Sequence, residues 1–343
     1  METIDDYAPL VAALKGARHV GVLTGAGVST LSGIPDFRGP KGLYANPDAE
    51  RIFDIDWFDR DPSVYYKGCR ELVYGLEKYA PNPVHEALAR LERCGILKGI
   101  ATQNIDMLHQ KAGSQIVWEV HGSPIRHHCR WCGAEKSFDE ICALLKGGVE
   151  IPRCSCGGAY KPDITFFGEQ LPEEAFVKSQ ELAIRSDVFL VLGTSLTVYP
   201  AAGLPRLTLQ AGGKVFVVNG SPTGLDAEAA FCGKDLAVFA EAILRSFPSE
   251  GPHGDCPRCL NLIGYGCRHT ANQSDCKLIQ PLFFCKMRPS AARASLLAVV
   301  LREGADNPLA ANAAFFIARD ACQSSHDKRM IREVVSGIFH LQP

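Results

Sequence analysis

Short apolar runs alternate with longer amphipathic segments from residue 3 to about residue 247. The runs are rich in valine, isoleucine and leucine and are bounded by glycine or polar residues, which is typical of buried strands. They predict strands at 19–24, 97–102, 116–120, 188–193 and 214–219. The segments between them predict helices, for example at 84–93, 201–211 and 236–247. This alternation predicts an α/β protein whose parallel sheet is covered by helices on both faces.

Two stretches interrupt the alternation. Residues 40–80 carry many aromatic side chains and predict a helical insertion, whereas residues 122–165 carry paired cysteines and predict a small metal-held module. Proline, glycine and serine then cluster at 247–254, which indicates a domain boundary. We therefore expect a domain at 1–247 that contains both insertions, and a cysteine-rich and helical extension at 248–343.

Composition narrows the possible partners. The net charge of the 343 residues is −2, so no overall basic field favours nucleic acid. We expect no membrane partner, because no apolar run reaches bilayer-spanning length. The N-terminus lacks a basic region followed by an apolar core, so we also expect no secretory signal and a cytoplasmic location. In that compartment the 14 cysteines favour metal sites and free thiols over disulfides.

The segment at 25–38, Gly-Ala-Gly-Val-Ser-Thr-Leu-Ser-Gly-Ile-Pro-Asp-Phe-Arg, follows the first predicted strand. Gly25 and Gly27 allow a tight turn and let a diphosphate approach backbone N–H groups. The residues after them are predicted to open a helix, whose N-terminus favours an anion. Thr30 replaces the third glycine that a hydride-transferring dinucleotide enzyme would show, which disfavours a dehydrogenase. An ordinary strand-to-helix turn is the alternative.

Polar side chains follow the next predicted strands. Ligands of open parallel sheets bind at the carboxyl ends of strands, so Asn104 and Asp106 are candidates to contact a ribose or a carboxamide. A helix cap formed by either residue is the alternative. His121 also ends a strand and could take a proton from a sugar hydroxyl near neutral pH. Gly193, Thr194, Ser195 and Asn219 end two further strands; they are candidates to hold adenosine, with simple turn chemistry as the alternative.

Two cysteine pairs, Cys129 with Cys132 and Cys154 with Cys156, have the close spacing that suits tetrahedral zinc, although one residue and not two separates the second pair. Unligated thiols are the alternative. Four thiolates leave no open coordination position, so the predicted site is structural. After these pairs the chain continues through Lys161 to Glu169 in an extended segment. A free edge there could pair with a peptide by strand addition. The alternative is a buried connecting strand with Phe166 and Phe167 in the core.

These motifs, in this order, resemble the sirtuin family over residues 1–247: GAGVSTLSGIPDFRG, TQNID, HG, the cysteine pairs, KPDITFFGE, GTSLTVYPA and VNG. The resemblance implies a Rossmann-like large domain, a zinc-bearing small domain and NAD-dependent removal of acyl groups from protein lysines. It also implies the chemistry. The acyl-lysine oxygen attacks C1′ of the nicotinamide ribose, and nicotinamide leaves. A histidine then activates a ribose hydroxyl, and hydrolysis yields lysine and O-acyl-ADP-ribose.

The resemblance also implies roles for individual residues. His121 matches the general base, and Asn104 and Asp106 match residues that hold the ribose and the carboxamide. The remaining cofactor matches are Gly25, Ala26, Gly27, Ser29, Asp36, Phe37, Arg38, Gln103, Gly193, Thr194, Ser195 and Asn219, with Arg38 also placed among the catalytic residues. Cys129, Cys132, Cys154 and Cys156 match the zinc ligands, and Thr165, Phe166, Phe167, Gly168 and Glu169 match the strip that pairs with the substrate peptide.

One departure from the family concerns the acyl group. Members that remove acidic acyl groups are similar in using Tyr-x-x-Arg in the helical insertion, where this chain has Tyr66 followed by Cys69, with Arg70 one residue later. One residue along a helix is a turn of about 100°, so Arg70 would not present the same guanidinium. The sequence therefore favours acetyl or longer neutral acyl groups over succinyl.

The C-terminal extension has no counterpart in the sirtuin core. It contains Cys256, Cys259, Cys267, Cys276 and Cys285, which could bind zinc or an iron–sulfur cluster. A cysteine-bearing loop over packed helices is the alternative. Two alternatives to deacylation remain for the same pocket: an enzyme that transfers mono-ADP-ribose or hydrolyses NAD, and a binding module that only senses NAD. The sequence also leaves the oligomeric state open.

Overall fold

The computed structural model describes residues 2–36 and 49–248. The chain divides into two compact units, residues 1–265 and 266–343, and every described residue belongs to the first unit. Phe37, Arg38 and the five cysteines predicted to bind a second metal lie outside the described residues.

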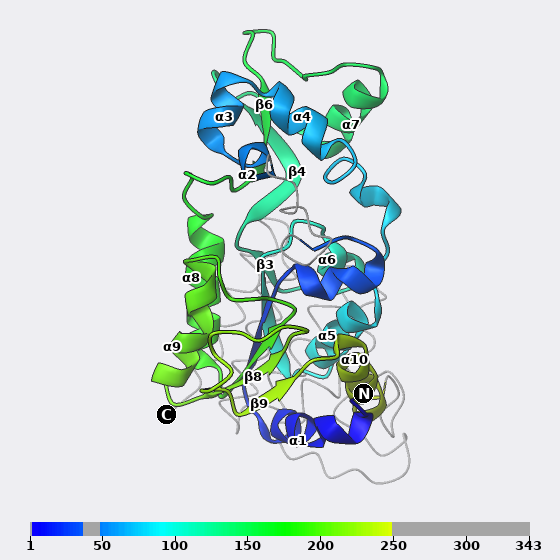
Figure 1. The fold of residues 1–343 in the computed structure, drawn as a ribbon, viewed down its shortest axis with the longest axis vertical. Helices are drawn as coiled ribbons and strands as arrows, with labels where there is room; N and C mark the ends of the chain where they lie inside the picture. Colours follow the sequence, from blue (N-terminus) through cyan, green and yellow to red (C-terminus); the bar gives the residue numbers. More distant parts are fainter. Residues whose placement is uncertain (1, 37–48, 249–343) are drawn as a thin grey trace, which may run out of the picture. The chain divides into compact units, whose positions relative to one another are not determined.

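A six-stranded sheet forms the centre of the described unit (Figure 1). Its strands are β1 (Val20–Thr24), β2 (Leu97–Thr102), β3 (Val117–Glu119), β7 (Val188–Leu192), β8 (Lys214–Val218) and β9 (Phe231–Gly233). They are all parallel, in the order β3-β2-β1-β7-β8-β9. From the central neighbours β1 and β7, the following strands are added outward on opposite sides, β2 and β3 next to β1 and β8 and β9 next to β7. This is the arrangement of a Rossmann-like sheet, and it confirms the predicted fold class. All five predicted strands are present; the short β9 was not predicted.

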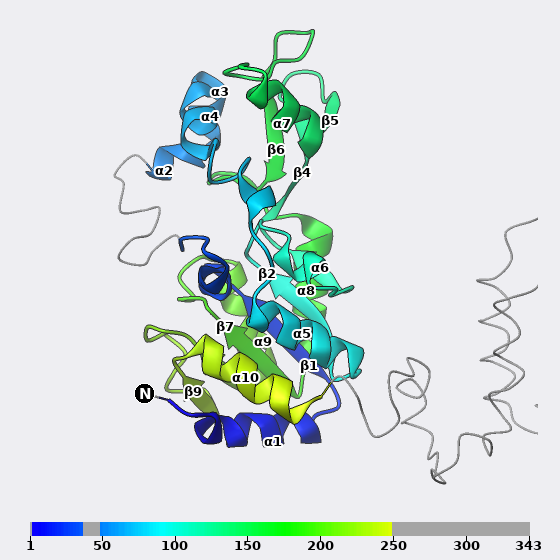
Figure 2. The ribbon, with the colours of Figure 1, turned by 90° about the vertical axis from the view of Figure 1, so that its right-hand side faces the viewer.

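Helices cover both faces of this sheet, and the strands alternate their side chains between them. Val188, Leu190 and Leu192 of β7 pack in one apolar cluster, to which α1 (Ala8–Gly16), α5 (Pro83–Arg93) and α10 (Leu236–Ser246) contribute. Phe189 and Val191 pack in a second cluster with α8 (Glu173–Arg185) and α9 (Leu204–Gln210). Figure 2 shows α5 and α10 on the near side of the sheet. Two-sided burial explains why the strands are almost continuously apolar.

Short elements join these layers. They are η1 (Ile4–Tyr7), η2 (Ala26–Ser32), η4 (Leu76–Lys78), η5 (Ala201–Gly203) and α6 (Leu108–Lys111). The predicted helix at 201–211 thus begins as the 3-10 turn η5. In the described residues, no helix is both long enough and apolar enough to cross a membrane.

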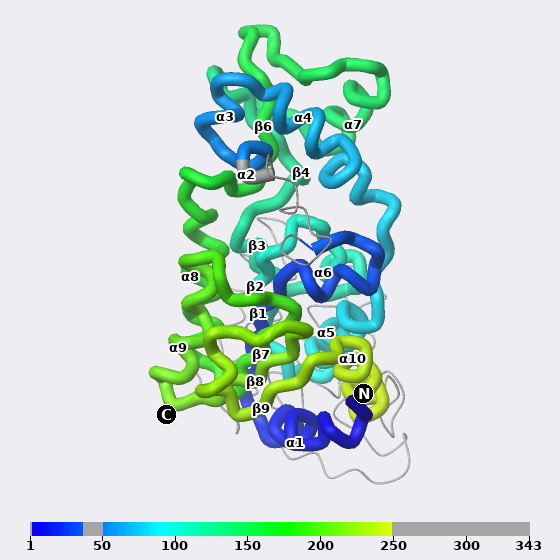
Figure 3. Tube along the Cα trace, viewed as in Figure 1, coloured from blue at the N-terminus to red at the C-terminus, as the bar shows by residue number. Residues whose placement is uncertain are grey.

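A second, smaller part is built from residues 49–75 and 122–169, which we call the small module; the other described residues form the sheet body. The small module contains α2 (Ala49–Ile52), α3 (Ile55–Arg60), α4 (Ser63–Cys69) and α7 (Phe138–Lys146). Its antiparallel sheet is ordered β5 (Glu135–Ser137), β4 (Gly122–Cys129), β6 (Tyr160–Ile164). The trace in Figure 3 passes from β3 into β4 and returns from β6 to α8. The carboxyl end of β3 is therefore a junction between the two parts.

Candidate active site

The glycine loop, the segment after β1 that contains Gly25 and Gly27, lies at the carboxyl ends of the neighbouring strands β1 and β7, where the direction of the strand order reverses. The N–H of Gly27 donates to the carbonyl of Gly193 at 2.9 Å. A Cβ on Gly27 would lie 2.7 Å from the Cα of Gly193, and Gly193 itself has a φ of +60°. Only glycine allows the two chain segments to approach this closely. The helix predicted after the loop is the 3-10 segment η2, which ends at Gly33 with a φ of 86°.

A cavity of about 1540 Å³ opens at this edge of the sheet. It receives most of the predicted site residues: Gly25, Ala26, Gly27, Asp36, Gln103, Asn104, His121, Thr165, Phe166, Phe167, Gly168, Glu169, Gly193, Thr194, Ser195 and Asn219. Ser29 and Asp106 do not line it. The structure thus brings together residues from five strand ends and from the small module, in a space large enough for more than one ligand.

Asn104, Ser29 and Asp106 form a buried chain of hydrogen bonds beside the cavity. The side-chain amide of Asn104 donates to the carbonyl of Gly25 and to Oγ of Ser29, both at 3.1 Å. The Ser29 hydroxyl in turn donates to Oδ2 of Asp106 at 2.6 Å. The other carboxylate oxygen of Asp106 accepts the N–H of Leu108, the first residue of α6, at 2.9 Å. Only Asn104 of the three reaches the cavity, and the other two fix its orientation.

Gln103, Thr194 and Asn219 also line the cavity. The side-chain amide of Gln103 donates to Oγ1 of Thr194 at 3.0 Å, which links the ends of β2 and β7. Asn219, after β8, donates its amide to the carbonyl of Ser221 at 2.7 Å. Polar groups thus line the cavity at the ends of β2, β7 and β8.

His121 occupies the junction between β3 and β4. Its Nδ1 lies 3.0 Å from the carbonyl oxygen of Gln103. A carbonyl can only accept, so Nδ1 carries a proton, and Nε2 of the neutral ring is the basic nitrogen. The carbonyl of His121 accepts the N–H of Thr165 at 2.8 Å, which fixes the backbone of the histidine to the small module.

The segment from Thr165 to Glu169, which we call the strip, borders the cavity from the small module. Phe166 is only 1% exposed, and its ring centroid lies 5.6 Å from that of Phe53. Phe167 is 43% exposed, whereas its N–H donates to the carbonyl of Phe53 at 2.7 Å. The ring of Phe166 is therefore a core group that also lines the cavity, as the alternative interpretation of the sequence had it, whereas the exposed ring of Phe167 is not in the core as that interpretation expected.

A buried network that the sequence analysis missed lies on the far side of Asn104. The backbone N–H of Asn104 donates to Oγ1 of Thr102, which also accepts the hydroxyl of Thr24 at 2.8 Å. Nε2 of His109 lies 2.9 Å from Oγ1 of Thr24. Burial lowers the pKa of His109, and it lowers the pKa of the neighbouring His85 to about 4. Polar residues inside a buried strand were the available signal, because they need partners there.

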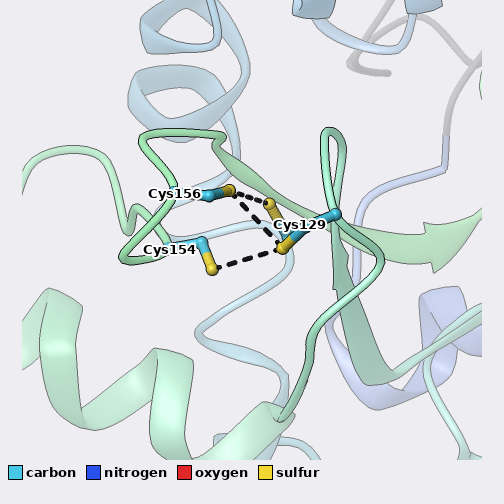
Figure 4. Close-up of side chains that lie close together, drawn as sticks. Cys129, Cys154 and Cys156 are labelled. Carbon is cyan, nitrogen blue, oxygen red and sulfur yellow. Dashed lines mark hydrogen bonds between the residues drawn. The ribbon is translucent and has the colours of Figure 1, made fainter.

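The four predicted zinc ligands converge at the end of β4. Figure 4 shows Cys129, Cys154 and Cys156 close together, and the sulfur of Cys156 lies 3.4 Å from that of Cys129. The sulfur of Cys132 lies 3.4 Å from that of Cys156 and 3.6 Å from that of Cys154. All four sulfur atoms lie within 4.8 Å of one another. These distances far exceed the ~2.05 Å of a disulfide. They agree with the edges of about 3.8 Å of a tetrahedron with 2.3 Å zinc–sulfur bonds. The donor set therefore fits one tetrahedral zinc ion.

Two residues considered for acyl selectivity have structural partners. Tyr66 is 1% exposed, and its hydroxyl donates to the carbonyl of Tyr160 at 2.6 Å. The guanidinium of Arg70 donates to the carbonyls of Leu145 at 3.0 Å and Val149 at 3.3 Å. Neither Tyr66 nor Arg70 lines the cavity.

Comparison with known proteins identifies close relatives. A model described as the Sir2 family matches residues 25–200. The NAD-dependent protein deacetylase of Thermotoga maritima is 40% identical over 233 residues, which cover 67% of this chain and 94% of that protein. The NAD-dependent protein deacylase 2 of Archaeoglobus fulgidus is 43% identical over 224 residues, covering 65% of this chain and 88% of that protein. A solved structure titled Sir2-p53 peptide-NAD+ has a TM-score of 0.65 and 38% identity, and the match covers 70% of this chain and 97% of that one.

Proposed function

The chain belongs to the Sir2 family, and from this premise we propose that it is an NAD-dependent protein-lysine deacylase that releases nicotinamide and forms O-acyl-ADP-ribose. Relatives named as deacetylases or deacylases, and a solved relative bound to a propionylated peptide, support this assignment. The observation that carries it in this chain is the convergence of His121, Asn104 and the strip on one cavity. We further propose that the catalytic domain ends near residue 247, just after α10.

We assign the glycine loop, Gln103, Thr194, Ser195 and Asn219 to the binding of NAD. Gly27 and Gly193 carry no side chains and approach each other closely, so the loop leaves open the space beside its backbone N–H groups that a diphosphate needs. When bound, NAD supplies the leaving nicotinamide and the ribose that receives the acyl group. Asn104, oriented by Ser29, presents its amide oxygen to this ligand, and Asp106 keeps Ser29 in place. Asp36 lines the same cavity; we assign Phe37 and Arg38 to the cofactor from the resemblance alone.

His121 acts as the general base in this proposal. The hydrogen bond from Nδ1 to the carbonyl of Gln103 leaves Nε2 able to take a proton from a ribose hydroxyl. The apolar groups of Phe53, Ile105 and Ile164 line the same cavity. They exclude water from the region where the acyl group must lie, which protects the reaction from premature hydrolysis.

We propose that the substrate peptide adds to the strip as an extended segment. The carbonyl of Thr165 and the N–H of Gly168 have no hydrogen-bond partner within residues 2–36 and 49–248, and both residues line the cavity. Free backbone groups of this kind are what strand addition uses. The side chains of Phe166 and Glu169 shape the strip from inside the small module.

We propose one structural zinc ion at Cys129, Cys132, Cys154 and Cys156, supported by the tetrahedral spacing of their sulfur atoms. With all four positions filled by thiolates, the ion would hold the small module together and take no part in the chemistry. We also propose a cytoplasmic location, because a reducing compartment preserves both zinc-bound thiolates and free thiols such as Cys69 and Cys232.

The test is to incubate the purified full chain with NAD and one peptide carrying acetyl, butyryl or succinyl lysine. Mass spectrometry would follow the peptide and the nucleotide product. We expect nicotinamide release, loss of the acetyl or butyryl group and formation of O-acyl-ADP-ribose. A peptide that gains ADP-ribose would instead identify a mono-ADP-ribosyltransferase. Nicotinamide release without peptide would identify an NAD hydrolase, and binding of NAD without nicotinamide release would identify a sensing module.

A further inference from the structure

The ammonium group of Lys161 is buried beside the strip. Its side chain is 8% exposed, and it lies on the edge strand β6 of the three-stranded sheet. It donates to the carbonyls of Pro162 at 3.1 Å and Ile164 at 2.7 Å, and it lies 2.7 Å from Oε2 of Glu169. Three donors thus meet three acceptors, 4.1 Å from the centroid of the Phe166 ring. A buried charge is retained only where such partners replace its hydration.

Glu169 closes the strip on itself. The carboxylate oxygen that meets Lys161 also accepts the backbone N–H of Phe166 at 2.9 Å. The N–H of Glu169 donates back to the carbonyl of Phe166 at 3.0 Å, and Gly168 between them has a φ of +92°. Oε2 of Glu169 is therefore engaged by Lys161 and by the N–H of Phe166, in addition to the peptide contact that the resemblance implies for this residue.

The strip is attached at two further points. Its first N–H, at Thr165, bonds to the carbonyl of His121, and the N–H of Phe167 bonds to the carbonyl of Phe53. These two bonds fix the ends of the Thr165–Phe167 segment, and the Lys161–Glu169 pair fixes the turn that follows. The carbonyl of Thr165 and the N–H of Gly168, which have no hydrogen-bond partner among the described residues, belong to the residues before and after the Phe166–Phe167 pair.

We propose that Lys161 and Glu169 are positioning residues: their ion pair, in which the Lys161 ammonium is buried, holds the extended Thr165–Phe167 segment and the turn after it in the form that receives the acylated peptide. This inference rests on the proposed function. Neither side chain acts on the reacting atoms in this account. Loss of the pair should weaken peptide binding and leave the binding of NAD intact, because the cofactor residues are held by the sheet body.

The experiment compares Lys161→Met with Lys78→Met in the full chain. Lys78 pairs with Glu71 at 3.4 Å, but both side chains are exposed, so this control removes a surface pair of little energetic value. For Lys161→Met we expect the KM for an acetyl-lysine peptide to rise about tenfold or more, because one partner of a buried pair is left alone. The KM for NAD should change less than about twofold, since no NAD-binding residue is altered. Lys78→Met should match the parent protein.

Hydrogen exchange of the strip gives a second readout that needs no turnover. In Lys161→Met, the amides of Phe166 and Glu169 should exchange faster than in the parent protein, while amides of β7 should not change. If the parent protein fails to process any acyl peptide, the proposed function fails, and exchange still decides whether the pair holds the strip. Unchanged exchange, or an equal rise of both KM values, would overturn the positioning role.

Two further variants guard against loss of folding. Glu169→Gln keeps an acceptor for the N–H of Phe166 but removes the charge that faces Lys161, so it should raise the peptide KM in the same direction. In the double variant with Lys161→Met, the two effects should not add, because each single change already breaks the same pair. Additive effects would show that the two residues act independently and would reject the proposal.

Discussion

The sheet body and the small module are built from different kinds of core. Aliphatic side chains dominate the body: its two clusters are formed mainly by valine, leucine, isoleucine and alanine on the two faces of one sheet. Aromatic side chains dominate the module, where Phe53, Phe58, Tyr65, Tyr66 and Phe166 pack edge to face. The module also carries the cysteine tetrad and the buried Lys161–Glu169 pair.

This difference indicates that the sheet body and the small module have different roles. The body buries enough apolar surface to fold around its own sheet, and it presents the residues assigned to NAD. The module has only three short strands, and parts of that size depend on added links such as a metal ion. The peptide strip belongs to the module, so cofactor binding and peptide binding should respond to different perturbations.

Loss of the metal site formed by the tetrad of cysteines, Cys129, Cys132, Cys154 and Cys156, should distinguish the small module from the sheet body most clearly. In Cys129→Ser, or after chelation, we expect the module to unfold while the body keeps its cooperative transition. Structural zinc sites contribute on the order of 10 kcal/mol to the folding of small units, so the effect should be large. Calorimetry and near-ultraviolet circular dichroism would follow the body and the aromatic cluster separately.

The matched control for this change is Cys232→Ser, since Cys232 is exposed, lies in the body and is outside the tetrad. It should melt like the parent protein. A zinc-free protein that retains a single unchanged transition would contradict the dependence of the module on metal.

His121→Ala tests the junction between the two parts. We expect kcat to fall by about 10²–10⁴-fold, the usual contribution of a general base, with the affinity for NAD nearly unchanged. Titration calorimetry with NAD and a nicotinamide-release assay would measure the two quantities. His128→Ala, which changes a histidine on β4 that pairs with Asp163, should retain activity. Near-normal turnover by His121→Ala would reject the base assignment.

The body was largely predictable from the sequence, because strands buried on both faces leave continuous apolar runs such as Val188–Leu192. The strand-end positions of Asn104 and His121 followed from the same pattern. The helix expected after Gly27 is a 3-10 segment, because no residue pattern distinguishes a 3-10 turn from the first turn of an α-helix. The pairing of Lys161 with Glu169 and the contact between Thr24 and His109 depend on how distant segments meet. Spacing along the chain does not record such contacts.

Acid should weaken the body through His85. This side chain is fully buried, and burial lowers its pKa to about 4. As pH falls below 6.5, the unfolded chain binds a proton that the folded chain refuses, so the free energy of unfolding falls until about pH 4. The loss from His85 between pH 7 and pH 5 should be about 2 kcal/mol. Burial also lowers the pKa of His109, so this residue contributes to the acid sensitivity in the same direction.

Urea unfolding at several pH values, followed by a probe in the body, would measure this loss. The informative variant is His85→Gln, because the N–H of Asn82 donates to Nδ1 of His85 in a capping box and glutamine can accept the same bond. We expect a flatter pH dependence in this variant. An equally steep fall would show that other groups cause the acid sensitivity.

The smallest expected effect concerns Tyr66, and it separates packing from selectivity within the module. The Tyr66 hydroxyl donates to the carbonyl of Tyr160 and does not reach the cavity. Tyr66→Phe should therefore lower the free energy of unfolding by about 1 kcal/mol, the net value of one buried hydrogen bond. It should leave the ratio of acetyl to succinyl removal unchanged, as measured by competition between the two peptides. A selective loss of succinyl removal would place this hydroxyl against the acyl group, which its bond to Tyr160 argues against.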